Sequence, residues 1–224
     1  MKNCIYLSYV GLGSNLLHLA YCHQIAKKYG PVTIITLCRN LEVVLKDDPL
    51  IEKIIFINKY HIRFIDILKL RKLLNTFNFD QIFIFYPSLR IYLAAKLSNI
   101  RKVFCYPLLK KNKLHLVNAA KKFTEKCLEI DNCPTETNFV INQTKIENIN
   151  KNLDNKKFKI IIGAGSSGPT TKWGAKNFYT LINKLNNTGN YYFFILCGLG
   201  DKNLSDEITN NIKKKNYITL YDKK

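Results

Sequence analysis

Three short stretches of the chain combine glycines with side chains suited to binding an anion or a sugar. They are Gly11-Leu12-Gly13-Ser14-Asn15, the longer run at residues 163–173, and Gly198-Leu199-Gly200-Asp201. Each follows an apolar run that predicts a strand. Ligands of α/β proteins bind beyond the carboxyl ends of parallel strands, so these three loops are the candidate binding positions.

The first stretch suits a ligand-binding turn. Gly11 and Gly13 allow a tight turn and a close approach to a ligand, and a helix capped by Ser14 or Asn15 is expected to follow. The N–H groups at such a helix N-terminus favour an anion or a polar sugar hydroxyl. The dinucleotide fingerprint is incomplete because Leu16 occupies the position of its third glycine. A plain strand-to-helix turn remains the alternative.

The second stretch contains the pattern G-x-G-x-x-G, but a dinucleotide site is disfavoured. Pro169 and four further residues separate the last glycine from the next helix, and no acidic residue follows about twenty positions later. What remains is a loop with many N–H and hydroxyl donors and with Lys172 beside the helix, which suits a diphosphate leaving group. A surface loop with a solvated lysine is the alternative. The third stretch, which contains Gly198, is fully explained by a tight turn.

Histidines and cysteines add few candidates. His18 lies one turn beyond Ser14 on the first predicted helix, where a lone histidine is more often a satisfied polar residue than a catalyst. His115 opens a basic helix, where it could reach a ligand or cap the helix at the surface. The seven cysteines form no C-x-x-C pair or zinc-type cluster, so free thiols and no metal site are expected.

Alternating strands and helices are expected to position these loops. Strands are predicted at residues 4–10, 32–38, 54–57, 81–85, 102–105, 158–162, 191–197 and 217–221. Helices are predicted from the first loop to Lys28 and at 41–46, 62–75, 88–97, 116–128, 175–187 and 204–214. The alternation indicates an α/β fold with mostly parallel, doubly wound sheets. A polar connection at 142–157 would join a domain at 1–141 to a second at 158–224, whose small size suggests a fragment.

The bulk composition predicts a soluble globular protein with basic surfaces. Its 224 residues are 47% hydrophobic and carry a formal net charge of +19, which favours anionic partners such as nucleic acid, a membrane surface or a phosphorylated sugar. Compositional drift is the alternative cause, since the charges are scattered. No signal peptide and no apolar run of about 18 residues is found, so any membrane contact should be peripheral.

In their order along the chain, these motifs resemble glycosyltransferase family 9, the ADP-heptose:lipopolysaccharide heptosyltransferases. The family's G-x-G-D-x-(L/V) element corresponds to residues 11–17, and its N-P-x-(I/V)-(D/E)-x-(I/V) element to residues 48–54. A strand followed by S-x-R/K resembles residues 83–90, and a helix-opening histidine resembles His115. The family's P-G-A-x-x-G-P-x-K-x-W-P loop is similar to residues 163–174.

The resemblance implies a GT-B-type fold with two Rossmann-like domains, the second truncated here. It implies inverting, metal-independent and cofactor-free transfer from a nucleoside-diphosphate sugar, usually ADP-heptose, to an anionic lipid-linked glycan such as lipopolysaccharide core. The protein would be cytoplasmic, with peripheral contact to the inner membrane. Substrate-binding candidates are Gly11, Gly13, Asn15, Ser88, Arg90, His115, Gly165, Ser166, Ser167, Thr170, Thr171 and Gly198.

Departures from the family pattern bear on activity. The family's catalytic aspartate corresponds to Ser14, and a neutral serine cannot take a hydroxyl proton near pH 7 as a carboxylate does. The catalytic candidates are therefore Ser14, His18 as a substitute base, and Lys172, which adjoins Trp173 instead of preceding it by two residues. The family's later D-T-G-x-x-H-L-A-A-A segment is absent.

Two other functions remain open. The second hypothesis is a relative that binds a sugar nucleotide but is catalytically impaired. The third is a basic nucleic-acid-binding protein, which is disfavoured because no known module motif occurs.

Overall fold

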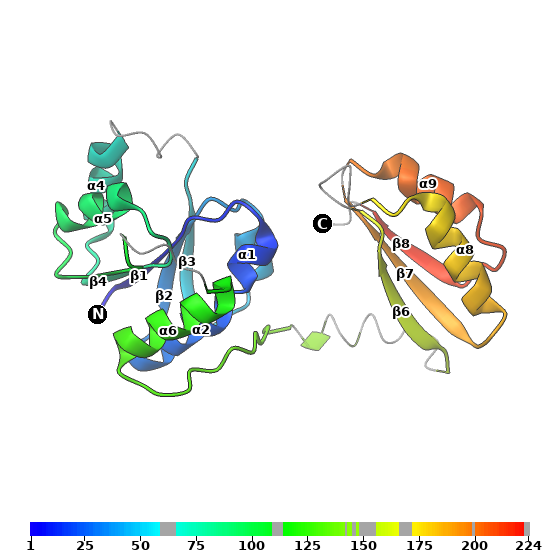
Figure 1. The fold of residues 1–224 in the computed structure, drawn as a ribbon, viewed down its shortest axis with the longest axis horizontal. Coiled ribbons are helices and arrows are strands. Elements are labelled where there is room, and N and C mark those ends of the chain that lie inside the picture. The colour runs from blue at the N-terminus through cyan, green and yellow to red at the C-terminus, as the bar shows by residue number, and fades with distance from the viewer. Residues whose placement is uncertain are drawn as a thin grey trace. The chain divides into compact units, whose positions relative to one another are not determined.

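The computed structural model describes residues 1–58, 66–108, 114–141, 143–144, 147, 156–165, 172–198 and 200–221. The chain divides into two compact units, Met1–Asn142 and Gln143–Lys224. Each unit has its own parallel sheet with helices packed on it (Figure 1).

The first unit is built on a five-stranded parallel sheet in the order β3-β2-β1-β4-β5. The central strands β1, β2 and β4 are buried along their whole length, as parallel strands are when helices cover both faces. All five strands agree with the sequence prediction, with shifted ends. Their bounds are β1 (Asn3–Leu7), β2 (Val32–Thr36), β3 (Ile51–Phe56), β4 (Gln81–Ile84) and β5 (Lys102–Cys105).

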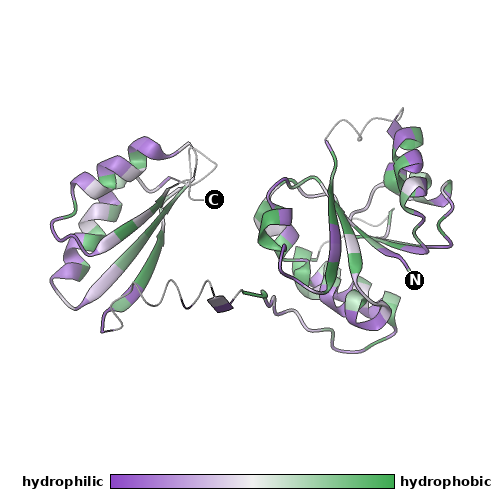
Figure 2. Cartoon of the chain, turned by 180° about the vertical axis from the view of Figure 1, so that it is seen from behind, coloured by the Kyte–Doolittle hydropathy of each residue, from purple (hydrophilic) through white to green (hydrophobic). Residues whose placement is uncertain are grey.

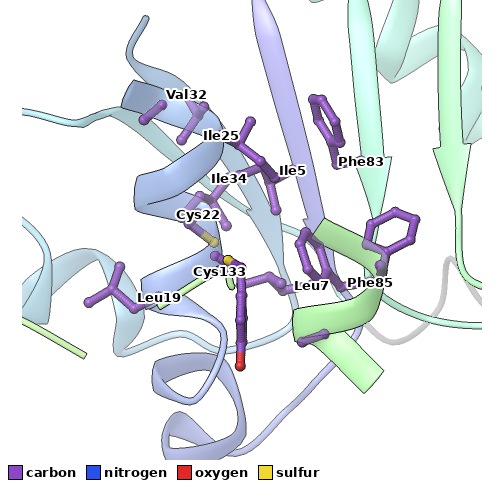
Figure 3. Packing of buried hydrophobic residues seen from close by; sticks show 14 of the residues in the cluster. Ile5, Leu7, Leu19, Cys22, Ile25, Val32, Ile34, Phe83, Phe85 and Cys133 are labelled. Carbon is purple, nitrogen blue, oxygen red and sulfur yellow. The ribbon is translucent and has the colours of Figure 1, made fainter. Parts of the chain in front are cut away.

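Helices cover both faces of this sheet and enclose two separate cores. On one face α2 (Leu19–Tyr29) and α6 (Leu116–Leu128) pack against Ile5, Phe83 and Phe85 (Figure 3). On the other face α4 (Asp66–Phe77) and α5 (Leu89–Lys96) belong to a second cluster that contains Tyr6 and Ile82. Successive strand residues point to opposite faces, so each strand contributes to both cores. The predicted residues 62–65 of α4 lie outside the described residues.

The segment after β1 differs from the prediction of one helix capped by Ser14 or Asn15. A short helix, α1 (Leu12–Leu16), already contains both residues, and its N-cap is Gly11 with no side-chain hydrogen bond. A new helix, α2, then begins with His18 at its N-cap. The predicted caps are therefore wrong, because the Asn15 side chain bonds to the carbonyl oxygens of Tyr9 and Gly11 and to Thr36 on β2, and does not accept from the first N–H groups of a helix. A further short helix, α3 (Leu41–Val44), precedes β3.

The second unit contains a three-stranded parallel sheet in the order β6-β7-β8. Its strands are β6 (Phe158–Gly163), β7 (Tyr191–Cys197) and β8 (Tyr217–Tyr221). The helices α8 (Ala175–Asn186) and α9 (Lys202–Asn210) lie on the same side of this sheet (Figure 1) and enclose one core around Phe193 and Ile195. In the described part of the chain, no helix is long and apolar enough to cross a membrane.

Candidate functional site

The first predicted loop lies at the carboxyl end of β1, where Gly11 and Gly13 are both exposed. Neither glycine has a positive φ, and a Cβ added to either would meet nothing within 4 Å. The chain therefore does not need glycine here to relieve strain. The missing side chains leave open space beside the half-buried Ser14.

Asn15 fixes this loop to the neighbouring strand. Its Nδ2 donates to the carbonyl oxygens of Tyr9 at 2.9 Å and Gly11 at 2.7 Å. Its Oδ1 accepts a hydrogen bond from the hydroxyl of Thr36 on β2 at 2.8 Å. Asn15 is only 1% exposed, so its polar atoms serve the shape of the loop and not contact with a ligand.

His18 is fully buried in an aromatic environment. Its ring stacks on Tyr9, with centroids 4.8 Å apart, and meets Phe85 edge-on at 5.4 Å. Nδ1 lies 2.7 Å from the carbonyl oxygen of Ser14 and donates to it, while Nε2 has no hydrogen-bond partner in the described structure. Burial lowers the pKa of the imidazole, and the bond to Ser14 partly opposes that shift. A substrate hydroxyl cannot reach this ring, so the geometry gives no support to His18 as a base.

Three further predicted residues of the first unit lie at helix starts. The Ser88 hydroxyl accepts from the backbone N–H of Ile91, which confirms the predicted cap of α5. Arg90 is exposed in the first turn of the same helix. His115 is exposed and caps α6, with Nδ1 accepting from Val117 N–H, so the surface-cap alternative is confirmed. These side chains are available at the surface, but no described contact unites them into one site.

The second unit has a pocket of about 580 Å³ at the carboxyl ends of β6 and β7. It brings together three of the predicted residues, Gly165, Lys172 and Gly198. The predicted Ser166, Ser167, Thr170 and Thr171 lie outside the described residues. The described residues of its lining are Gly163, Gly165, Lys172, Leu196, Cys197, Gly198, Gly200 and Asp201.

An ion pair spans this pocket. Lys172 Nζ lies 3.1 Å from Asp201 Oδ1, and the lysine side chain is 45% exposed while that of the aspartate is 13% exposed. Gly165 makes the arrangement possible, because a Cβ at this position would lie 2.5 Å from Asp201 Oδ2. Asp201 is also the N-cap residue of α9, whose first N–H groups receive no side-chain cap. The pocket therefore combines a partly exposed ammonium group with a helix N-terminus, both of which attract an anion, and with the carboxylate of Asp201, which an anion would have to displace from Lys172.

Asp201 is the charged residue of this pocket that the sequence prediction did not include among its site candidates. The signal was present, because β6 and β7 are adjacent parallel strands and their following loops must meet at one edge of the sheet. A lysine in one loop and an aspartate in the other are then natural partners.

A larger cavity, of about 650 Å³, lies between β5 and α6 and contains none of the predicted site residues. Its lining is mainly apolar, with two lysines, Lys122 and Lys126. Within the described ranges, no group of three or more histidine, cysteine, aspartate or glutamate residues could hold a metal ion. The pocket in the second unit therefore remains the place where the predicted chemistry and the geometry coincide.

No protein-family model matches the sequence, and no curated protein matches it either. Solved structures do match, over nearly the whole chain. A glycosyltransferase family 9 protein from Veillonella parvula aligns with 100% of this chain and 70% of its own, at 16% identity and a TM-score of 0.73. The Escherichia coli ADP-heptose lipopolysaccharide heptosyltransferase II aligns with 99% of this chain and 72% of its own, at 17% identity and a TM-score of 0.63.

A third similar structure is the Escherichia coli heptosyltransferase WaaC, which was solved with ADP. It aligns with 98% of this chain and 74% of its own, at 12% identity and a TM-score of 0.66. Likeness at such low identity concerns the fold. The expected α/β, GT-B-type fold is confirmed, and the chain shares it with glycosyltransferase family 9 and heptosyltransferase structures.

Proposed function

We propose that this chain is a glycosyltransferase that takes its sugar from a nucleoside-diphosphate sugar. The proposed donor is ADP-heptose, and the proposed acceptor is lipopolysaccharide core or a related anionic glycan at the cytoplasmic face of the inner membrane. The observation that carries this proposal is the pocket at the ends of β6 and β7, with Lys172 and the N-terminus of α9 at its wall. The likeness in fold to a heptosyltransferase solved with ADP supports the same choice.

The proposed chemistry is an inverting displacement without a metal ion. The acceptor hydroxyl attacks the anomeric carbon of the donor sugar while the bond to the diphosphate breaks. Negative charge then grows on the leaving diphosphate, where Lys172 and the N–H groups of α9 stabilise it. Gly165 and Gly198 leave the backbone accessible, so a phosphate can approach closely. On the first unit, the open space beside Ser14 receives the acceptor.

Nucleotide binding by two lysine variants tests the donor site. Lys172→Ala removes the one lysine among the described residues of the pocket lining, and loss of a charge-assisted contact of about 1.5–3 kcal/mol should weaken ADP binding at least about tenfold. Lys176→Ala is the matched control, because Lys176 is an exposed lysine on α8 outside the pocket lining. Titration calorimetry of the full chain with ADP gives the comparison. Equal binding by the two variants would remove the support for Lys172.

A catalytically impaired sugar-nucleotide-binding protein is the second candidate. It is favoured by the first loop, where Ser14 stands in place of a carboxylate and the nearby His18 is buried. This candidate predicts that the chain binds ADP-heptose but releases no ADP from it, with or without an acceptor glycan. Steady release of ADP in the presence of acceptor would exclude it in favour of the active enzyme.

A further inference from the structure

The cavity between β5 and α6 lies within the first unit and has a volume of about 650 Å³. Val103 and Phe104 both line it, although successive residues of a strand point to opposite faces of a sheet. β5 is the last strand of its sheet and pairs only with β4 among the described strands. The cavity therefore lies along the free edge of β5.

One side of α6 forms the opposite wall of the cavity. Its lining residues follow a spacing of three and four, which places side chains on one face of a helix. They are Ala119, Lys122, Phe123, Lys126 and Cys127. The helix advances 1.5 Å per residue, so this wall is about 12 Å long.

The size and the lining of this cavity are those of a ligand site. Protein interiors are close-packed and contain few voids larger than a water molecule, whereas small-molecule pockets occupy about 300–1,000 Å³. In Figure 2 the strands of the first unit are mainly hydrophobic, and its helices carry both colours. Apart from two lysines, the described lining is aromatic, aliphatic or thiol, with no acidic residue. An apolar ligand body would therefore fit between β5 and α6.

Two lysines determine the charge at the mouth of the cavity. Lys122 and Lys126 line the cavity but are exposed, so their side chains reach solvent. They lie four positions apart on α6, a spacing at which like charges repel each other. The nearby Glu125 pairs with Lys121 at 3.7 Å, and the described contacts include no ion pair of Lys122 or Lys126. An anion at the mouth would relieve their repulsion.

We propose that this cavity binds a single-chain carboxylate, with its hydrocarbon chain between β5 and α6 and its carboxylate at Lys122 and Lys126. An extended chain advances about 1.2 Å per bond, so a chain of about ten bonds covers the wall that α6 provides. The ligand class is therefore a fatty acid of medium length. This proposal does not rest on the donor pocket or on transfer activity.

Three probes, each titrated into the full chain below its micellar concentration, test the chemistry of the ligand. Dodecanoate has the proposed chain and head group, octanoate has a shorter chain, and dodecylammonium has a cationic head group. Each buried methylene contributes about fourfold in affinity, so dodecanoate should bind at least about tenfold more tightly than octanoate. It should also bind at least about tenfold more tightly than dodecylammonium, because only its charge complements the lysines.

Charge variants locate the carboxylate of the ligand. In the double variant Lys122→Gln/Lys126→Gln, dodecanoate should bind at least about tenfold more weakly, because both charge-assisted contacts are lost. The matched control is Lys72→Gln/Lys96→Gln, which removes exposed lysines of α4 and α5. These helices belong to the core on the other face of the sheet. Circular dichroism melting curves confirm that each variant is folded.

Cysteine labelling reports occupancy of the cavity independently. Cys105 and Cys127 are partly exposed and line the cavity, whereas the other cysteines are buried. Burial raises the pKa of Cys105 to about 11 and that of Cys127 to about 12, so labelling with iodoacetamide is followed by mass spectrometry at alkaline pH. Dodecanoate at about ten times its Kd should slow labelling of both thiols about tenfold, because roughly a tenth of the cavities stay empty.

Several results would overturn the proposal. Equal binding of dodecanoate and dodecylammonium, or equal binding to the two double variants, excludes recognition of the carboxylate by Lys122 and Lys126. Unchanged labelling of Cys105 and Cys127 at saturating dodecanoate places the ligand elsewhere. Protection of these thiols by phosphatidylglycerol vesicles but not by dodecanoate identifies a bilayer surface instead. Protection only by a blocked peptide of alternating threonine and valine identifies addition of a strand to β5.

Discussion

Replacement of Asn15 tests how the glycine loop after β1 is held. In Asn15→Ala the carbonyl oxygens of Tyr9 and Gly11 lose their donor, and the hydroxyl of Thr36 loses its acceptor. Each of these three hydrogen bonds contributes about 0.5–1.5 kcal/mol, so the free energy of unfolding of the first unit should fall by about 2–4 kcal/mol. Asn118→Ala on α6 is the control, because Asn118 is exposed, and it should change stability by less than about 0.5 kcal/mol.

Asn15→Asp adds a pH dependence of known sign. The new carboxylate would face the carbonyl oxygens of Tyr9 and Gly11 in a site that is 1% exposed, so its pKa in the folded chain should rise above the usual value of about 3.9. A group with a raised folded-state pKa stabilises the fold only while it is protonated. The stability deficit of this variant, relative to the unchanged chain, should therefore grow as the pH rises above about 4.

Urea denaturation at several pH values measures both the stability loss of Asn15→Ala and the pH dependence of Asn15→Asp. The single tryptophan, Trp173, belongs to the second unit, so its fluorescence is an internal control that the Asn15 variants should not shift. Tyrosine fluorescence and circular dichroism report on both units, so a transition that they show and tryptophan fluorescence does not show belongs to the first unit. A loss below about 1 kcal/mol in Asn15→Ala, or an equal shift of the tryptophan transition, would refute the role assigned to Asn15.

Three further perturbations follow from the described contacts. Gly165→Ala should shift the unfolding transition that tryptophan fluorescence reports by about 1–3 kcal/mol, because the added Cβ would overlap Asp201. Gly163→Ala is the control and should cause no such shift, because a Cβ there would meet nothing within 4 Å. Equal effects of the two substitutions would contradict this packing. Burial lowers the pKa of His18 in the folded chain, so as the pH falls below about 6.5 this histidine takes up a proton more readily in the unfolded chain. The free energy of unfolding should therefore fall between about pH 7 and pH 5. If His18→Phe shows the same dependence on pH, other groups cause it. Ser14→Asp should raise the rate of ADP release from ADP-heptose if the proposed acceptor site is intact; an unchanged rate would count against Ser14 as the position of the base.

Local patterns in the sequence predicted most of the fold. The buried strand β2 is a run of β-branched residues, and β4 is apolar after Gln81. The serine after Tyr86-Pro87 marks the start of α5, where Ser88 is observed as the cap. These signals lie within a few neighbouring residues. They can therefore be recognised without knowledge of the tertiary structure.

The errors come from contacts between distant residues. Asparagine is a common helix cap, but the Asn15 side chain bonds to Thr36, 21 positions later, and does not accept from the first N–H groups of a helix. Asp201 pairs with Lys172 across 29 positions, and the pairing of the two preceding strands, not a local pattern, brings these residues together. Lys172 and Gly198 were predicted as separate loop residues, and the pairing of β6 with β7 is what places both loops around one pocket.

The position of β1 in its sheet has a consequence for synthesis of the chain. β1 is made first but lies in the middle of the sheet, between β2 and β4. Asn3 pairs with Val32 on one side and with Gln81 on the other, and the Gln81 side chain bonds to Asn3 across 78 positions. β1 therefore leaves the ribosome long before β4, its second neighbour in the sheet, has been made. During that interval the free edge of β1 is exposed to other chains and can pair with their strands. The yield of folded protein should therefore depend on how well this edge is protected during translation.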